Sequence, residues 1–218
     1  SNTLAATGKY DEAERAVLKA RAFFDAWLPP KHYGRAVPRL ILGRLRVEQR
    51  RPSEAVPLFQ EALDLCTQQG GCPPRVRAEF LWDLGRAQRE AGRWHDAIEN
   101  MRTSLAVREK IDAPNHAFLL RIRVDLADAL RGAGDFLEAS ATLSAINPRA
   151  IADLRPHQQA LADLRRVQGL LWLESKDSER ARSALQELLE ILNHRLGTQH
   201  WRTERARDEL LRVQPSRG

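Results

Sequence analysis

Apolar residues recur along this chain at steps of three and four positions, the spacing that gathers them on one face of an α-helix. The first such segment covers residues 9–27 and carries Ala13, Ala16, Val17, Ala20 and Phe24. Similar segments follow up to residue 213, separated by short stretches in which Gly, Pro, Asn and Asp are frequent. Alternating strand patterns are absent from the sequence. The pattern therefore predicts an all-α protein.

The helical pattern repeats with a period of 42 residues. One small residue recurs five times at this interval, at Ala13, Ala55, Ala97, Ala139 and Ala181. A second small position recurs at Gly43, Gly85, Ala127 and Gly169. A large residue recurs at Val17, Phe59, Met101, Leu143 and Leu185. A fixed period of this length indicates an array of helix–turn–helix units, each of which packs on its neighbours.

The repeated residues have a packing interpretation. Small residues allow the first and second helix of a unit to approach closely, and the large residue fills the remaining space. Gly92 and Gly134 lie where the chain reverses between the two helices, and a left-handed backbone there is cheap only for glycine. These positions are therefore predicted to be structural.

The period divides the chain into a partial unit and four repeats. The partial unit covers residues 4–29, and the repeats cover about 30–72, 73–113, 114–154 and 155–197, followed by a capping helix at 200–213. Residues 149–154 are predicted to be a turn or loose coil. Because the chain opens in the middle of a unit, we expect that it was cut from a longer protein.

This arrangement resembles the tetratricopeptide repeat. The consensus residues of that family fall on Leu81, Leu84, Gly85, Gly92, Ala97 and Met101. The usual period is 34 residues, and the longer one resembles the variety found in kinesin light chains. Residues 196–203 are similar to the LGxxHPxT junction of that variety, with Trp201 where proline is common. The resemblance implies a right-handed α-solenoid of antiparallel helix pairs, about ten helices in a single domain over residues 1–218.

Long repeats of this kind are known from bacterial multidomain regulators. The resemblance therefore implies a cytoplasmic bacterial signalling protein, such as a serine/threonine kinase or a transcriptional regulator. Kinase motifs do not occur within these 218 residues.

Composition adds little to this interpretation. The net charge is +6, but only five of the 35 basic residues are Lys, and an arginine excess is expected from a GC-rich genome. Nucleic-acid binding is thus the weaker alternative. We expect Cys66 and Cys72 to be free thiols in a reducing compartment, with a disulfide between them left open. No apolar run approaches the 18 residues of a membrane span.

The sequence offers no catalytic chemistry. Its six histidines are scattered, and HExxH, GxGxxG and GxxxxGK[ST] motifs are absent. A nucleophile elbow is absent as well. We therefore predict a protein that is not an enzyme and needs no metal or cofactor.

The resemblance implies that the first helices line a concave groove that binds a protein or peptide. The groove residues expected on this basis are Arg44, Trp82, Arg86, Arg89, Arg121, Arg131 and Arg166. Arginine suits carboxylates, and Trp and Arg are frequent hot spots of binding, so we expect a segment of acidic character. The alternative is that these arginines are paired within the array, with Glu79 and Asp128 as neighbours.

A second hypothesis is that the chain is a structural or oligomerising segment of a larger protein. On the first helix, the face of Ala13, Val17 and Ala20 is expected to need a cover, which a second copy could supply in a homodimer.

Overall fold

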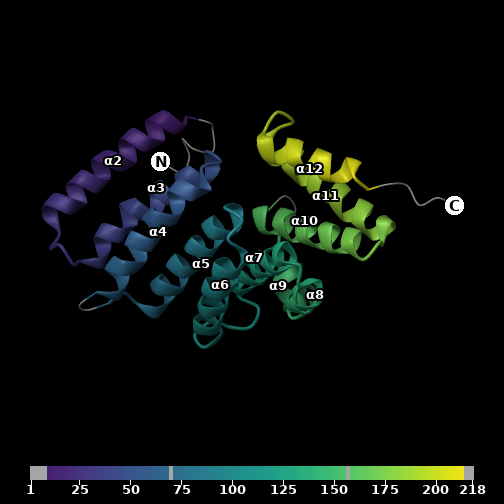
Figure 1. Cartoon of the computed structure of the whole chain (residues 1–218), viewed down its shortest axis with the longest axis horizontal. Helices are drawn as coiled ribbons and strands as arrows, with labels where there is room; N and C mark the ends of the chain where they lie inside the picture. Colours follow the sequence, from purple (N-terminus) through teal and green to yellow (C-terminus); the bar gives the residue numbers. More distant parts are fainter. Residues whose placement is uncertain (1–8, 69–70, 156–157, 214–218) are drawn as a thin grey trace. The chain divides into compact units, whose positions relative to one another are not determined.

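The structure is a computed structural model that describes residues 9–68, 71–155 and 158–213 (Figure 1). Within these ranges the chain forms eleven α-helices and one short 3-10 helix, and contains no strand. The elements are α2 (Tyr10–Trp27), η1 (Tyr33–Arg35), α3 (Ala36–Glu48), α4 (Pro52–Thr67), α5 (Pro74–Glu90), α6 (Trp94–Glu109), α7 (Ala117–Ala133), α8 (Phe136–Ser144), α9 (Pro148–Ala152), α10 (Gln159–Glu174), α11 (Ser178–Leu196) and α12 (Trp201–Leu211). The all-α prediction is confirmed.

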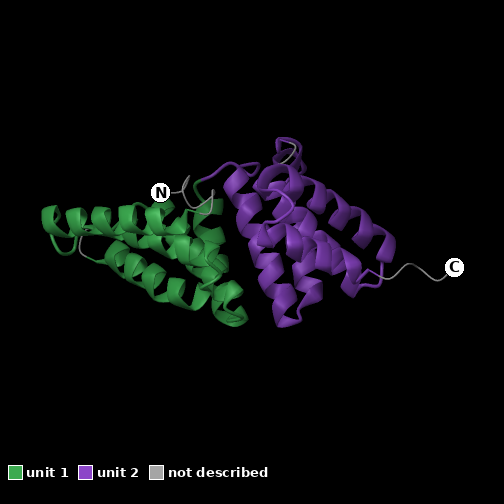
Figure 2. Cartoon of the chain, turned by 90° about the horizontal axis from the view of Figure 1, so that it is seen from above, with its two compact units in different colours: residues 1–111 green, residues 112–218 purple. Residues whose placement is uncertain are grey.

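The helices form two compact units, residues 1–111 and 112–218 (Figure 2). In unit 1, α2 packs on α3, and the helix–turn–helix pairs are α3/α4 and α5/α6. In unit 2, the pairs are α7/α8 and α10/α11, and α12 packs on α11. The first helices of the four pairs are thus α3, α5, α7 and α10, as the 42-residue period predicts.

A glycine of the first helix lies against a large side chain of the second helix in three of these pairs. The contacts are Gly43–Phe59, Gly85–Met101 and Gly169–Leu185. A Cβ added at these glycines would lie only 2.7 to 2.9 Å from the large side chain. The large residues are fully buried, so the packing role predicted for both positions is confirmed.

The pair α7/α8 departs from this pattern. Its small residue is Ala127 in place of glycine, and Leu143, at the position of the large residue, remains partly exposed. The second helix, α8, has only nine residues. The prediction of a turn or coil at 149–154 is wrong, because the helix α9 begins at Pro148. Asn147 caps it by accepting a hydrogen bond of 2.9 Å from the backbone N–H of Arg149.

The turn between the two helices of each pair contains one residue with a positive φ. These residues lie 42 positions apart and are Arg50, Gly92, Gly134 and Lys176, with φ of 61°, 75°, 90° and 63°. The left-handed backbone predicted at Gly92 and Gly134 is confirmed. The same conformation is present in the other two pairs without glycine.

The expectation of free thiols is wrong, because Cys66 and Cys72 form a disulfide. Cys66 lies in the last turn of α4, and the backbone N–H of Cys72 donates to the Cys66 carbonyl over 2.8 Å. This hydrogen bond folds the connection back and leaves the two Cα atoms 4.9 Å apart, a separation that suits a disulfide. Spacing alone could not show that the chain folds back here.

Candidate functional site

The residues expected to bind a partner lie on the first helices of the pairs. Arg44 is on α3, Trp82, Arg86 and Arg89 are on α5, Arg121 and Arg131 are on α7, and Arg166 is on α10. In each unit, some of them meet carboxylates of the neighbouring pair and form a network of ion pairs.

The network of unit 1 joins α3 to α5. Arg44 Nη2 lies 2.6 Å from an oxygen of Asp83 and 2.6 Å from an oxygen of Glu79. The carboxylate of Asp83 also lies 3.8 Å from Arg86 on its own helix. The side chain of Asp83 is 1% exposed and that of Arg44 is 32% exposed. The carboxylate therefore lies beneath the guanidinium groups.

Burial and charge act in opposite directions on this network. Burial disfavours the charged form of Arg44, but the charge of Asp83 and the hydrogen bonds to Asp83 and Glu79 outweigh it and raise the pKa of Arg44. Burial also raises the pKa of Asp83, against the pull of both guanidinium groups. Arg44 consequently keeps its charge whenever the protein is folded.

Trp82 does not offer its ring to a partner in this structure, because it is only 3% exposed. The guanidinium carbon of Arg86 lies 4.8 Å from the centre of the Trp82 ring, a distance that allows a cation–π contact. Arg89 lies 2.7 Å from Glu90, the next residue on α5. Trp82 thus supports Arg86 from below.

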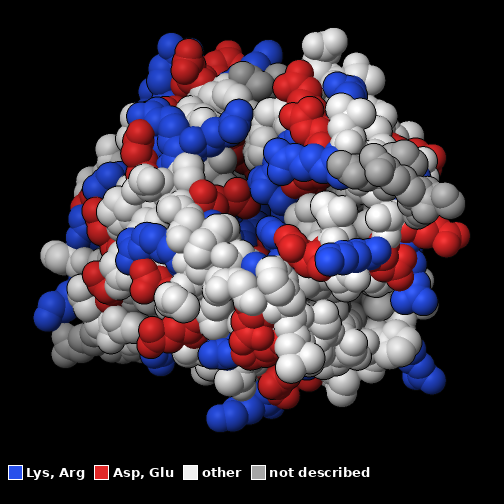
Figure 3. All heavy atoms as spheres, turned by 45° about the vertical axis from the view of Figure 1, so that its right-hand side comes forward, with Lys and Arg blue, Asp and Glu red and all other residues white. Residues whose placement is uncertain are grey.

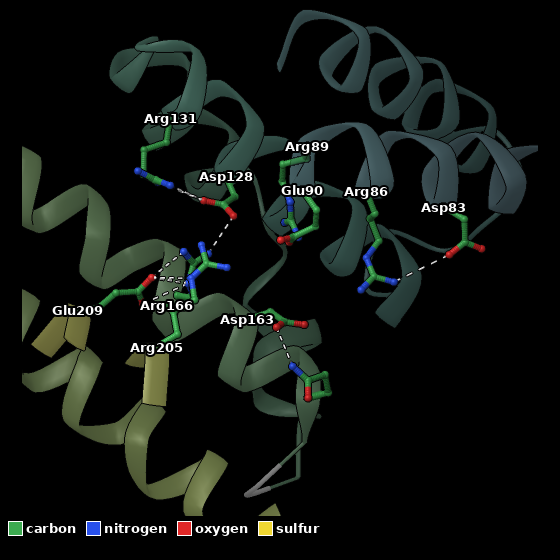
Figure 4. A network of polar contacts seen from close by, with 11 residues as sticks. Asp83, Arg86, Arg89, Glu90, Asp128, Arg131, Asp163, Arg166, Arg205 and Glu209 are labelled. Atoms are coloured by element: carbon green, nitrogen blue, oxygen red, sulfur yellow. Dashed lines mark hydrogen bonds and ion pairs between the residues drawn. The ribbon is translucent and has the colours of Figure 1, made fainter. Parts of the chain in front are cut away.

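The network of unit 2 joins α7, α10 and α12 (Figure 4). Arg166 lies at its centre, 3.0 Å from Asp128 and 2.7 Å from Glu209. Arg131 donates to Asp128 over 3.0 Å, and Arg205 donates to Glu209 over 3.2 Å. Glu209 is 8% exposed and Arg205 is 45% exposed. Here too the carboxylates are buried and guanidinium groups face outward.

Three residues of these networks were absent from the sequence prediction, namely Asp83, Glu209 and Arg205. Arg205 lies 84 positions after Arg121 and could have been found by continuing the period into the last helix. The period gives a partial signal for Asp83 and Glu209, because Asp125 and Glu209 correspond to Asp83 at multiples of 42 but Ile41 and Val167 do so in the other repeats. Of the predicted residues, Arg121 is exposed near the start of α7.

Other kinds of site find no support in the part of the chain that is described. Its His, Cys, Asp and Glu side chains form no group of three or more that could hold a metal ion. Among the described helices, none is both long and apolar enough to cross a membrane. On the face drawn in Figure 3, basic and acidic side chains are interspersed, whereas nucleic acids are usually bound by a basic stripe.

The sequence profile of the tetratricopeptide repeat matches residues 1–68 and 76–144, more than half of the chain. The chain belongs to the tetratricopeptide repeat family. No curated protein sequence matches it significantly. Solved structures of other tetratricopeptide repeat proteins, however, are similar to the structure of this chain, and the similarity covers most of both chains.

One of them contains the nearly identical TPR-like repeats of a kinesin light chain from Podosopora anserina, with a TM-score of 0.67 and 18% identity over 88% of this chain and 92% of that one. Another is BtubC (BKLC) from P. vanneervenii, with a TM-score of 0.65 and 17% identity over 95% and 82% of the two chains. At such identities the likeness shows the fold alone. The predicted tetratricopeptide solenoid of kinesin-light-chain type is thereby confirmed.

Proposed function

We propose that this tetratricopeptide repeat protein is a non-catalytic interaction module that binds a protein or peptide segment on the surface of its first helices and α12. Members of the family generally serve as scaffolds for protein–protein interactions. The observation that supports this surface is the layering of both networks. The carboxylates of Asp83, Asp128 and Glu209 are buried beneath guanidinium groups that remain partly exposed.

The layering also favours a partner with carboxylates. A guanidinium group carries five N–H donors in a planar fork that matches the two oxygens of a carboxylate. Arg205 in unit 2 and Arg44 in unit 1 are the more exposed members of their pairs. We infer that these exposed guanidinium groups attract a side chain of Asp or Glu on the partner.

The proposal extends to the place where the protein acts in the cell. We propose that the chain acts in the cytoplasm of a bacterium as part of a larger signalling protein. This setting is supported by the resemblance to the long repeats of bacterial regulators.

An array of acidic, neutral and basic peptides, probed with the labelled chain, tests the proposal. We expect the acidic peptides to be retained preferentially, and the variant Arg205→Ala to bind them with at least about fivefold lower affinity, as for a hot-spot arginine. Arg180→Ala is the matched control, since Arg180 is an exposed arginine on α11, a second helix. Equal losses with both variants, or no preference for acidic peptides, would refute the proposed surface.

A second candidate function is self-association through α2. The face of Ala13 and Val17 is not exposed as expected, because both residues are buried and pack near Leu42 and Leu45. The exposed large apolar side chains of this helix are instead Leu18, Phe23 and Trp27, which are 44%, 59% and 74% exposed. The ring centroids of Phe23 and Trp27 are 5.8 Å apart. Exposed aromatic patches of this kind commonly mark interaction sites.

Sedimentation velocity distinguishes this candidate from peptide binding. We expect the wild-type chain to associate as its concentration rises and the double variant Phe23→Ser/Trp27→Ser to remain monomeric. Leu137→Ser is the matched control, because Leu137 is a highly exposed leucine on α8. A wild-type chain that stays monomeric at high concentration counts against self-association and leaves the peptide-binding proposal intact.

A further inference from the structure

A cleft of about 320 Å³ opens in unit 2 between α8 and the second half of α10. Its apolar walls are formed by Phe136 and Leu143 from α8 and by Leu171 and Trp172 from α10. None of these residues belongs to the arginine–carboxylate networks on the first helices. The cleft is therefore a separate feature of the fold.

The cleft exists because α8 lacks side chains that other second helices provide. Ser140, which lines the cleft, corresponds to Val56 on α4 and to the buried Ile98 on α6, at intervals of 42 residues. Leu143 lines the cleft and remains partly exposed. Ser140 thus leaves space in the cleft that a branched apolar side chain at this position would partly fill.

The charged residue that lines the cleft is acidic, whereas a cation beside the cleft, Arg165, donates to the lining residue Gln168 over 2.9 Å and is paired with Glu187. Glu174 lines the cleft itself and is exposed. Asp135 immediately precedes Phe136, and Asp177 lies two residues after Ser175, which also lines the cleft, with Lys176 between them. A visiting apolar group flanked by a positive charge would be favoured over one flanked by a negative charge.

The polar lining suits a peptide backbone. The hydroxyl of Ser144 donates to the carbonyl of Ser140, and the hydroxyl of Ser175 donates to the carbonyl of Trp172, each over 3.0 Å. With their protons used in this way, both oxygens retain lone pairs that can accept N–H groups. An enclosed cavity for a free apolar molecule would not need acceptors at its edge.

We propose that this cleft binds a segment of a partner protein that inserts one leucine-sized side chain next to a lysine or arginine. The apolar walls receive the inserted side chain, Glu174 pairs with the neighbouring cation, and the serine hydroxyls accept backbone N–H groups. This site is independent of the surface on the first helices.

Nuclear magnetic resonance titration of the full chain with short capped peptides tests the proposal. The probe is acetyl-Ser-Lys-Leu-Lys-Gly-amide, compared with versions in which alanine replaces the leucine or glutamate replaces both lysines. We expect the probe to shift the Trp172 indole N–H and the methyl groups of Leu143 and Leu171. The two comparison peptides should bind at least about tenfold more weakly, because each loses the apolar side chain or its favourable charge.

Filling the cleft provides the second arm of the experiment. Ser140→Ile introduces the side chain that α6 carries at the corresponding position and should weaken binding of the probe at least about tenfold. Ala141→Ile is the matched control, since Ala141 is the next residue on α8 and is exposed outside the cleft lining. Circular dichroism establishes that both variants are folded.

If Ser140→Ile does not fold, the variant Glu174→Gln tests the proposal in its place. It should weaken binding of the lysine peptide and leave binding of a peptide with serines in place of lysines unchanged. Equal affinity for all peptides, or wild-type affinity in Ser140→Ile, would overturn the proposal. Shifts of the same size with free leucinol at equal concentration would also overturn it and would indicate a cavity for small molecules.

Discussion

Lys176 has a backbone conformation that two corresponding turns give to glycine. Its φ is 63°, beside 75° at Gly92 and 90° at Gly134. For a residue other than glycine, this conformation costs about 1 kcal/mol of conformational free energy. We therefore expect Lys176→Gly to raise the free energy of unfolding by about 1 kcal/mol, measured by urea denaturation.

The reverse substitution is the natural control. A Cβ added at Gly134 would meet nothing within 4 Å, so Gly134→Ala introduces backbone strain without a clash. It should lower the free energy of unfolding by about 1 kcal/mol. If both substitutions shift stability in the same direction, the positive φ is not the source of the effect.

Glu14 and Arg46 form a two-pronged ion pair between α2 and α3, with N···O distances of 2.7 and 2.5 Å. The hydrogen bonds from Arg46 lower the pKa of Glu14 below its ordinary value of 4.5. A lowered pKa means that the stabilisation is complete above pH 4.5 and is lost as pH falls through the pKa of the folded state. We expect Glu14→Gln to cost about 1 kcal/mol at pH 7.

The difference in unfolding free energy between Glu14→Gln and the wild type should shrink as the pH is lowered from 7 to 3. Thermal melts across this range measure it. Glu12→Gln is a suitable control, because Glu12 is an exposed carboxylate on the same helix and its replacement should matter little at any pH. A pH-independent difference for Glu14→Gln would argue that the carboxylate charge contributes nothing.

At the scale of helices, the 42-residue period was sufficient to predict the pairing and the glycine contacts. Each pair depends on local spacing and on small residues that are visible in the sequence. The sequence prediction failed at α9, where Asn147 caps a helix that begins at Pro148 in place of the predicted coil. An Asn-Pro pair can end one helix and also begin another. Whether the residues after it form a helix or a coil depends on what that segment packs against.

The candidate site was predictable in part for a similar reason. The period placed Arg44 and Arg166 on the correct helices, but their partners lie 39 and 43 positions along the chain, on the next pair. Whether Asp83 or Glu209 lies beside an arginine depends on how neighbouring helices cross. The sequence carries no local signal for that geometry, and likewise none for the burial of Trp82.

The connection between α4 and α5 is closed by the disulfide between Cys66 and Cys72. Closing so short a loop restricts the unfolded chain and should contribute about 2 kcal/mol. We expect Cys72→Ser to lower the free energy of unfolding by about this amount, measured by urea denaturation without a reducing agent.

Reduction provides the corresponding control. With dithiothreitol present, the wild type and Cys72→Ser should have nearly equal stabilities, because neither then has the crosslink. Titration with Ellman's reagent should detect no free thiol in the native, unreduced wild-type protein. Two titratable thiols in that protein would show that the disulfide is not formed.

At the scale of the whole chain, the two compact units raise the question of whether one of them folds without the other. Unit 2 contains a hydrophobic cluster of its own around Leu185, Leu188 and Ile191, and the ion pairs of Arg166 with Asp128 and Glu209 lie within that unit. In repeat proteins stability is close to a sum of local terms. We therefore expect the fragment 112–218 to fold alone.

The fragment should show the helical circular dichroism expected for α7 to α12 and unfold cooperatively in urea, with a free energy of about 5 kcal/mol or more for a chain of this size. A fragment of residues 135–218 is the matched control. It lacks α7, which packs against both α8 and α10 and supplies Asp128 to the network. Without this helix the apolar sides of α8 and α10 are uncovered, so the shorter fragment should lose helicity and cooperativity. If 112–218 is unfolded, or if both fragments are equally stable, unit 2 does not fold through the contacts of α7.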